Sequence, residues 1–258
     1  MIHKARPLRT RSSGETSAGT VRFRCLSPSP ASPSVPRRRS KPSESTIRRL
    51  SLYLRALEGL GEEGESTASS ELLAGRVGTT AAQVRKDLSH FGSFGKRGLG
   101  YEVAPLQVHL KEILGLHRRW PVVLVGAGRI GSALFEYPHF GARGFEIVAI
   151  LDRDPAKVGR RWGEVEISSM DELESVVHDR KAELAILTIP WDGAQDVAEA
   201  LVAAGVRGIL NFAPLQLRLP PEIEVNDVNL ALEMEALSFA LHLGGSQVDG
   251  VDARSGEG

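Results

Sequence analysis

The run Val122-Val123-Leu124-Val125-Gly126-Ala127-Gly128-Arg129-Ile130-Gly131 decides the fold of this 258-residue chain. Its first four residues are apolar, as in a buried strand, and lead into a G-x-G-x-x-G pattern that opens a helical stretch. In this pattern Gly126 permits a tight turn, Gly128 lets the backbone approach a pyrophosphate, and Gly131 lets the helix pack close to the strand. Free N–H groups at the helix start then face the phosphates. Residues 126–131 are therefore predicted to bind a dinucleotide.

An acidic residue supports this prediction. Asp152 closes the next apolar stretch, some 20 to 25 residues after the glycines, where a carboxylate hydrogen-bonds a ribose hydroxyl and repels a 2′-phosphate. The pattern predicts NAD and NADH as ligands, with Arg153 beside the acid leaving NADP as an alternative. A glycine turn with a purely structural role is the other interpretation.

Strand and helix patterns alternate between residues 121 and 213, which predicts a parallel, doubly wound sheet. Ligands of such sheets bind outside the carboxyl ends of the strands. We therefore expect two strand ends to form walls of the cofactor site: Thr188, Ile189 and Pro190, and Asn211, Phe212, Ala213 and Pro214. The prolines at 190 and 214 are alternatively simple strand terminators.

The segment before the sheet has the pattern of a helix-turn-helix. An amphipathic helix starts near Ser45. A short second helix follows Ser69 and Ser70, and Thr79 or Thr80 caps a third helix. Four glycines and two cations in 92–101 then indicate a β-hairpin with a basic tip, the wing of a winged helix.

A polar face on the third helix is the predicted DNA-binding surface. Arg85 and Lys86 carry donors suited to guanine or phosphate, and Gln83 suits adenine or phosphate. Lys96 and Arg97 at the wing suit a narrow minor groove. Ser69, Ser70 and Thr79, at the helix starts, complete the predicted set. A solvated polar face is the alternative.

The last apolar pattern, in 229–241, is a helix whose leucines and Met234 follow a four-three-four spacing, with Phe239 widening the apolar face. Such a face calls for a partner, and we expect a second copy of the chain. Packing on the chain's own sheet domain is the alternative.

The first 42 residues hold ten Lys and Arg against Glu15, a net charge of +9, so the remainder carries −9 in a neutral chain. Their Ser, Pro and Arg bias predicts a disordered arm that attracts phosphate. A passive tail, a start codon placed too far upstream and a transit peptide are alternatives. No apolar run approaches the ~20 residues that span a bilayer, and the lone Cys25 forms no internal disulfide, so a cytoplasmic protein is expected.

No catalytic arrangement emerges from the sequence. Its seven histidines are scattered, none is spaced to pair with a Ser or Cys nucleophile, and no cluster has metal-ligand spacing. The chain is expected to be neither an enzyme nor a metal protein. An NAD-dependent dehydrogenase is the competing interpretation, and a DNA-binding scaffold that senses nothing is the third.

Five stretches together resemble the Rex family of bacterial redox-sensing transcriptional repressors, over roughly residues 44–243. They are TIRRLSLYLRALEGL (46–60), SSELLAGRVGTTAAQVRKDLSHFGSFGKRGLGYEV (69–103), VVLVGAGRIGSAL (122–134), ILDRDPAKVG (150–159) and RGILNFAPLQL (207–217). The resemblance implies a homodimer that binds a palindromic operator when NAD⁺ is plentiful and releases it when NADH binds. It also implies that the C-terminal helix is exchanged, lying between the partner's winged helix and Rossmann domain.

The resulting prediction is an α/β protein in five parts. They are a disordered basic arm (1–43), a winged helix-turn-helix DNA-binding domain (44–118), a Rossmann NAD(H)-binding domain (119–226), a domain-swapped helix (227–243) and a flexible tail (244–258).

Redox sensing requires that NADH and NAD⁺ contact the site differently. The nicotinamide ring is neutral in NADH and cationic in NAD⁺, so we expect an apolar pocket of Ile189, Pro190, Ala213 and Phe239 to favour NADH. In the family a Tyr after the glycine-rich helix, here Tyr137, is associated with an Asp at the start of the C-terminal helix as part of the redox switch. The aligned position here is Asn229, so the switch is either altered or uses Asp227.

Overall fold

The computed structural model describes residues 42–96 and 98–245, with side chains through residue 243. Most of the predicted basic arm, Arg97 at the wing and the tail beyond residue 245 lie outside these residues. Within the described ranges no helix is long and apolar enough to cross a membrane.

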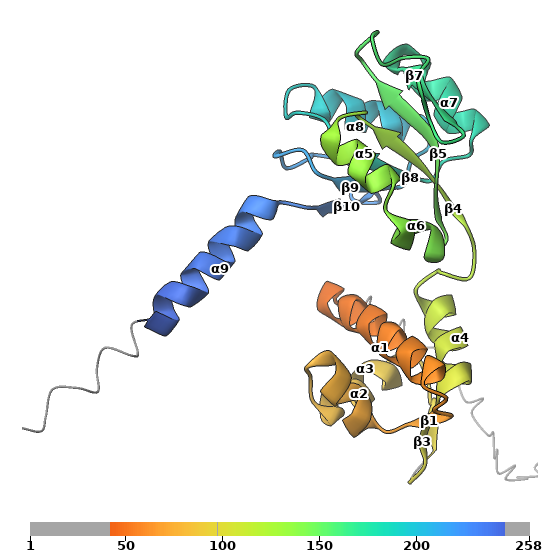
Figure 1. Cartoon of the computed structure of the whole chain (residues 1–258), viewed down its shortest axis with the longest axis vertical. Coiled ribbons are helices and arrows are strands. Elements are labelled where there is room, and N and C mark those ends of the chain that lie inside the picture. The colour runs from red at the N-terminus through yellow and green to blue at the C-terminus, as the bar shows by residue number, and fades with distance from the viewer. Residues whose placement is uncertain (1–41, 97, 246–258) are drawn as a thin grey trace, which may run out of the picture. The chain divides into compact units, whose positions relative to one another are not determined.

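Three helices form the predicted N-terminal head (Figure 1): α1 (Glu44–Glu62), α2 (Ser70–Val77) and α3 (Ala81–Ser89). The side-chain oxygens of Ser43, Ser69 and Thr80 each accept the backbone N–H three residues on, and so cap the three helices. Of the two caps considered for α3, the structure selects Thr80. Gly78 ends α2 at a φ of 70°, a left-handed conformation suited to glycine.

The head contains a small antiparallel sheet, in the strand order β1-β3-β2. Its strands are β1 (Thr67–Ala68), β2 (Gly95–Lys96) and β3 (Gly100–Glu102), and α4 (Val103–Ile113) follows directly. The predicted hairpin is thus present, with β1 as an added strand. Pro105 lies in the first turn of α4, where a helix does not need that residue's N–H. Tyr53, Leu54 and Leu57 of α1 lie at the centre of the head's apolar core.

The second sheet has the order β10-β9-β8-β4-β5-β7-β6. Its strands are β4 (Trp120–Val125), β5 (Phe145–Asp152), β6 (Arg161–Trp162), β7 (Val165–Ser169), β8 (Leu184–Leu187), β9 (Gly208–Asn211) and β10 (Glu224–Asp227). All neighbours pair in parallel except β6 and β7. The predicted parallel sheet is confirmed, with one antiparallel edge strand that was not predicted.

Helices cover both faces of this sheet (Figure 1). On one face Val123 and Leu151 pack with residues of α7 (Leu173–Asp179) and α8 (Ala194–Ala203). On the other, Leu124 and Ile150 pack near α5 (Arg129–Phe135) and α6 (Pro138–Ala142). A short 3-10 helix, η1 (Met170–Glu172), precedes α7. The chain starts the sheet at β4 and adds strands on either side, so β4 and β8 meet where the winding reverses, which is where such folds bind ligands.

Helix α9 (Leu230–Gly245) follows β10, and Asn229 caps it by accepting the N–H groups of Ala231 and Leu232. Every described side chain of α9 is exposed. The large apolar ones are Leu230, Leu232, Met234, Leu237, Phe239, Leu241 and Leu243. The predicted stripe of Leu230, Met234, Leu237 and Leu241 is therefore present and uncovered. Phe239 does not widen it, because at about 100° per residue Phe239, Leu232 and Leu243 lie on the opposite side of the helix.

Candidate functional site

Two glycines close the turn between β4 and α5. Gly126 has a φ of 103°, and a Cβ there would lie 2.7 Å from the carbonyl oxygen of Thr188. Gly131 lies beneath the turn, where a Cβ would collide with the carbonyl oxygen of Gly126. Gly128, in contrast, faces open space, with nothing within 4 Å of a Cβ placed there. The turn is therefore compact underneath and open above, which leaves room for a ligand at the start of α5.

Thr188, at the end of β8, holds this turn in place. Its hydroxyl lies within hydrogen-bond distance of the carbonyl oxygens of Gly126 (2.8 Å) and Val125 (3.0 Å), which share its one proton. Its backbone N–H donates to the same Val125 oxygen. The strand end that was predicted as a cofactor wall thus also fixes the glycine loop.

Asp152 is buried at the end of β5 and is also bonded to the glycine loop. Its Oδ2 accepts the backbone N–H of Ala127 at 2.7 Å and the ammonium of Lys157 at 2.9 Å, and its Oδ1 accepts the N–H of Asp154 at 2.8 Å. Burial raises the pKa of Asp152, but these three donors outweigh it and hold the pKa below its ordinary value. The carboxylate is therefore ionised at neutral pH.

A cleft of about 1100 Å³ opens over the carboxyl ends of these strands. The predicted residues that line it are Gly126, Gly128, Arg129, Ile130, Asp152, Arg153, Thr188, Ile189, Pro190 and Phe212. Pro214, the last residue of the second predicted strand end, also lines it. Further lining residues not singled out from the sequence include Asp154, Lys157, Met170, Asp192 and Val197. Arg153 lies 3.8 Å from Asp192 across the cleft rim. Within the described residues no cluster of three His, Cys, Asp or Glu side chains could hold a metal ion.

The structure places the remaining predicted cofactor residues elsewhere. Ala127 lines a neighbouring groove with Trp162. Asn211 and Ala213 are buried, because successive side chains of an extended segment alternate and Phe212 takes the cleft side. The Asn211 amide donates to Leu215 and Asp227 and accepts from the Ala213 N–H. Gly131 lies beneath the turn, as described above, and Phe239 is exposed on α9.

The three predicted switch residues each have a different local role. Tyr137 is half-exposed at the start of α6, with its ring edge-on to Phe140. Asp227 ends β10 and accepts the amide of Asn211 at 2.8 Å. Asn229 caps α9. Among the described residues no hydrogen bond joins Tyr137 to either of the other two.

The DNA-binding residues predicted in the head lie on α2, α3 and the wing. Val84 and Leu88 point into the core, whereas Arg85 and Lys86 are exposed. The Arg85 guanidinium donates to the hydroxyl of Ser70 at 2.6 Å and to the carboxylate of Glu71 at 3.1 Å.

On the wing, Lys96 pairs with Glu102 at 2.6 Å and remains exposed. Thr79 is half-buried between α2 and α3. Two cations thus stand on one helix, and a third on the hairpin.

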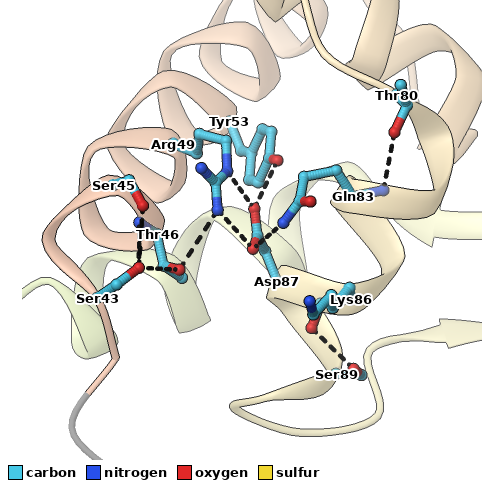
Figure 2. A network of polar contacts seen from close by, with 10 residues as sticks. All are labelled: Ser43, Ser45, Thr46, Arg49, Tyr53, Thr80, Gln83, Lys86, Asp87 and Ser89. Carbon is cyan, nitrogen blue, oxygen red and sulfur yellow. Dashed lines mark hydrogen bonds and ion pairs between the residues drawn. The ribbon is translucent and has the colours of Figure 1, made fainter.

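Asp87, which was not singled out from the sequence, is the centre of a polar network between α1 and α3 (Figure 2). Its carboxylate accepts Arg49 Nε at 2.6 Å and Nη2 at 2.9 Å, the Tyr53 hydroxyl at 2.9 Å and the Gln83 amide at 2.7 Å. The Gln83 amide nitrogen, expected to face DNA, is therefore bonded inside the head. Helical spacing could have revealed Asp87, because it lies beside Leu88 and three residues after Val84, on the inward stripe.

Burial raises the pKa of Asp87, but the hydrogen bonds from Arg49, Gln83 and Tyr53 outweigh it and hold the pKa below its ordinary value. Burial, followed by the bond to Asp87, raises the pKa of Tyr53 well above its ordinary value. The network therefore consists of an ionised carboxylate, a guanidinium and a neutral phenol.

Comparisons with known proteins match both halves of the chain. A family model described as a putative DNA-binding protein N-terminus matches residues 41–89, and one described as a CoA binding domain matches residues 117–215. The redox-sensing transcriptional repressor Rex of Carboxydothermus hydrogenoformans is 50% identical over 196 residues, which cover 76% of this chain and 94% of that protein. The chain belongs to the Rex family. Rex of Chloroflexus aggregans is likewise 45% identical over 204 residues, covering 79% of this chain and 96% of that protein.

Solved structures of a Rex-family repressor, RSP, agree with this assignment. RSP in complex with β-NAD⁺ and operator DNA has a TM-score of 0.77 at 35% identity, covering 83% of this chain and all of that one. RSP in complex with β-NADH has a TM-score of 0.72 at 34% identity, covering 79% and 96%. The predicted fold, a DNA-binding head followed by a Rossmann-like sheet domain, is confirmed, as is the predicted family. This Rex chain is thus a redox-sensing transcriptional repressor by family.

Proposed function

We propose that this chain binds operator DNA as a homodimer and leaves it when NADH binds, so that its occupancy of DNA follows the NADH/NAD⁺ ratio. The observation that carries the proposal is the ionised, buried Asp152, bonded to the backbone of the glycine loop beside a cleft large enough for a dinucleotide. The RSP complexes with NAD⁺, NADH and operator DNA support the same ligands here.

In the cleft, the pyrophosphate lies on the open side of Gly128 at the start of α5, and Asp152 accepts a ribose hydroxyl. The proposed cofactor-binding set is Gly126, Ala127, Gly128, Arg129, Ile130, Gly131, Asp152, Arg153, Thr188, Ile189, Pro190, Asn211, Phe212, Ala213 and Phe239. Gly131, Asn211 and Ala213 act from below by shaping the loop and strand end. Ile189, Pro190 and Phe212 form an apolar wall that disfavours the cationic ring of NAD⁺ and so favours NADH.

In the head, α3 is the recognition helix and lies in the major groove. Its exposed Arg85 and Lys86 contact bases and phosphates, with Ser69, Ser70, Thr79 and Gln83 around them and Lys96 and Arg97 in the minor groove. Arg85 exchanges Glu71 for DNA on binding, because its pair with that exposed carboxylate is a weak surface interaction.

The exposed apolar surface of α9 is the observation that supports a homodimer. A soluble chain does not leave seven large apolar side chains of one helix exposed without a partner surface, and a second copy of the chain provides one by helix exchange. Exchange would bring Phe239 and the cap residue Asn229 to the partner's cleft, near Tyr137 and Asp227. We assign Tyr137, Asp227 and Asn229 to the coupling between redox state and DNA release.

We propose that the dinucleotide is sensed and not used for catalysis. The described lining of the cleft contains no His, Tyr or Cys. Its one Lys is paired with Asp152, and of its three carboxylates Asp152 is bonded to the glycine loop and Asp192 faces Arg153. A hydride transfer would need a general acid or base near the nicotinamide. We place the protein in the cytoplasm, where a repressor meets both DNA and the NAD(H) pool.

The test is a gel shift with a DNA duplex enriched from a random pool by the wild-type protein, run across NADH/NAD⁺ ratios. Micromolar NADH should release the duplex, whereas the same concentration of NAD⁺ should not. Binding that ignores both nucleotides would leave only the DNA-binding scaffold. Turnover of NADH with any of a panel of small carbonyl compounds would support the dehydrogenase instead.

A further inference from the structure

The recognition helix is attached to α1 in two physically different ways. The first is apolar: Val84 and Leu88 are buried among leucines of the head. The hydrophobic effect that drives this contact has no preferred direction, so it favours burial of the helix face without defining its rotation. A second attachment, with directional bonds, is needed to hold one orientation.

The carboxylate of Asp87 provides the directional bonds. It is only 3% exposed, and within the described residues it accepts four hydrogen bonds from side chains of α1 and α3. Two of them form a fork with Arg49, which constrains distance and angle together. A buried ion pair contributes little net stability compared with well-packed apolar side chains, but it can select one geometry among several.

The orientation of α3 decides where its cations lie. Successive residues of an α-helix are about 100° apart, so Arg85 points about 200° away from Asp87 and Lys86 about 100° away. Anchoring Asp87 inward therefore directs both cations outward. A rotation of ~10° moves side chains at the helix's ~5–6 Å radius by about 1 Å. That is more than the roughly 0.5 Å range of a good hydrogen bond, so base contacts would be lost.

We propose that Arg49 and Asp87 are positioning residues for operator recognition, with Tyr53 and Gln83 completing their bonds. Asp87 is buried and does not contact DNA. The pair acts by fixing the rotation of α3 on α1. This inference rests on the proposed function, and it assigns to the interior of the head part of the sequence discrimination. Gln83 then contributes through Asp87, since its amide nitrogen is already engaged.

Two kinds of variant separate positioning from stability. In Asp87→Asn, one oxygen becomes an NH₂ group that faces donors of Arg49, Tyr53 or Gln83. In the triple variant Arg49→Met, Tyr53→Phe, Asp87→Leu, apolar side chains replace the network, which should keep the melting temperature at or above that of the wild type. Arg49→Lys keeps the charge and loses the fork, and remains available if another variant fails to fold.

Asp87→Asn and the triple variant should each lose roughly tenfold or more in affinity for the enriched duplex, the loss expected for one base contact. Affinity for a scrambled duplex and for NADH should stay unchanged. The matched control is Arg48→Met, since Arg48 is adjacent on α1 but pairs only with the exposed Glu44 in the described residues. It should bind both duplexes like the wild type, apart from any small change common to both.

Wild-type affinity for the enriched duplex in a folded triple variant would overturn the inference. So would an equal loss on both duplexes in Asp87→Asn. Another contrary result is that Arg49→Lys weakens binding to both duplexes and lowers the salt dependence of that binding, whereas Asp87→Asn does neither. In that case Arg49 is a phosphate contact and the inference fails. A wild-type protein that selects no duplex at all would refute the proposed function as well.

Discussion

Leu237→Ala should weaken the homodimer by about two orders of magnitude. The substitution removes three carbon atoms, worth ~2.4 kcal/mol at ~0.8 kcal/mol per buried CH₂ group. Leu237 is 59% exposed in the single chain, so a partner that covers it fully gains about 1.4 kcal/mol from these atoms. In a two-fold symmetric dimer each substitution counts twice, which gives about 2.8 kcal/mol, or roughly a hundredfold in the dimer Kd.

Sedimentation velocity over a dilution series without DNA measures this Kd directly. The chain offers a matched control, because Leu99 in the wing is a leucine with the same 59% exposure. Leu99→Ala should leave the dimer Kd unchanged. A shift of less than threefold for Leu237→Ala, or equal shifts for both variants, would refute the assignment of α9 as the dimer contact.

The remaining predictions concern DNA, cofactor, acid and salt. Arg85→Ala should cost at least ~1 kcal/mol in operator binding, measured by fluorescence anisotropy, and leave NADH affinity intact; equal losses in both would contradict separate sites. Gly126→Ala should abolish NADH binding in calorimetry, since its φ of 103° and the contact with Thr188 exclude a Cβ, whereas near-normal affinity would show that the turn can adapt. The lowered pKa of Asp87 means that its ionised form stabilises the fold above its ordinary pKa of 3.8, and that this contribution is lost as the pH falls below that value. The free energy of unfolding should accordingly fall less steeply with decreasing pH in Asp87→Asn than in the wild type. Identical pH profiles would contradict this stabilising role of the ionised Asp87. Deleting residues 1–42 should flatten the salt dependence of DNA binding if the arm contacts phosphates, and an unchanged slope would mark a passive tail.

Local sequence signals predicted the fold well. The glycine loop, the acid at the end of β5 and the three capped helices each depend on residues close together in sequence, and the structure has all of them. The periodicity of α9 also correctly placed one apolar stripe, Leu230, Met234, Leu237 and Leu241, but not Phe239, which lies on the opposite side of the helix. Such features follow from backbone geometry and helix capping, which act over a few residues.

What the sequence did not reveal depends on contacts between distant segments. Arg49 and Asp87 are 38 residues apart, and their pairing exists only because α1 and α3 pack together. Lys157 is close to Asp152 in sequence, but its bond to that carboxylate depends on the turn after β5. The side of the chain that Asn211 and Ala213 face follows from the pleat of β9, and a shift of one residue reverses it.

The bond between Asp152 and the Ala127 N–H has a consequence for redesigning the ligand preference. Replacing the acid after the second strand is the direct way to admit the 2′-phosphate of NADPH. Here the same carboxylate holds the glycine loop and neutralises Lys157, so the replacement would leave a buried N–H and an ammonium without their acceptor. An NADPH-responsive sensor built on this scaffold should therefore keep Asp152 and introduce its new cation at the cleft rim, where Arg153 and Asp192 already face each other.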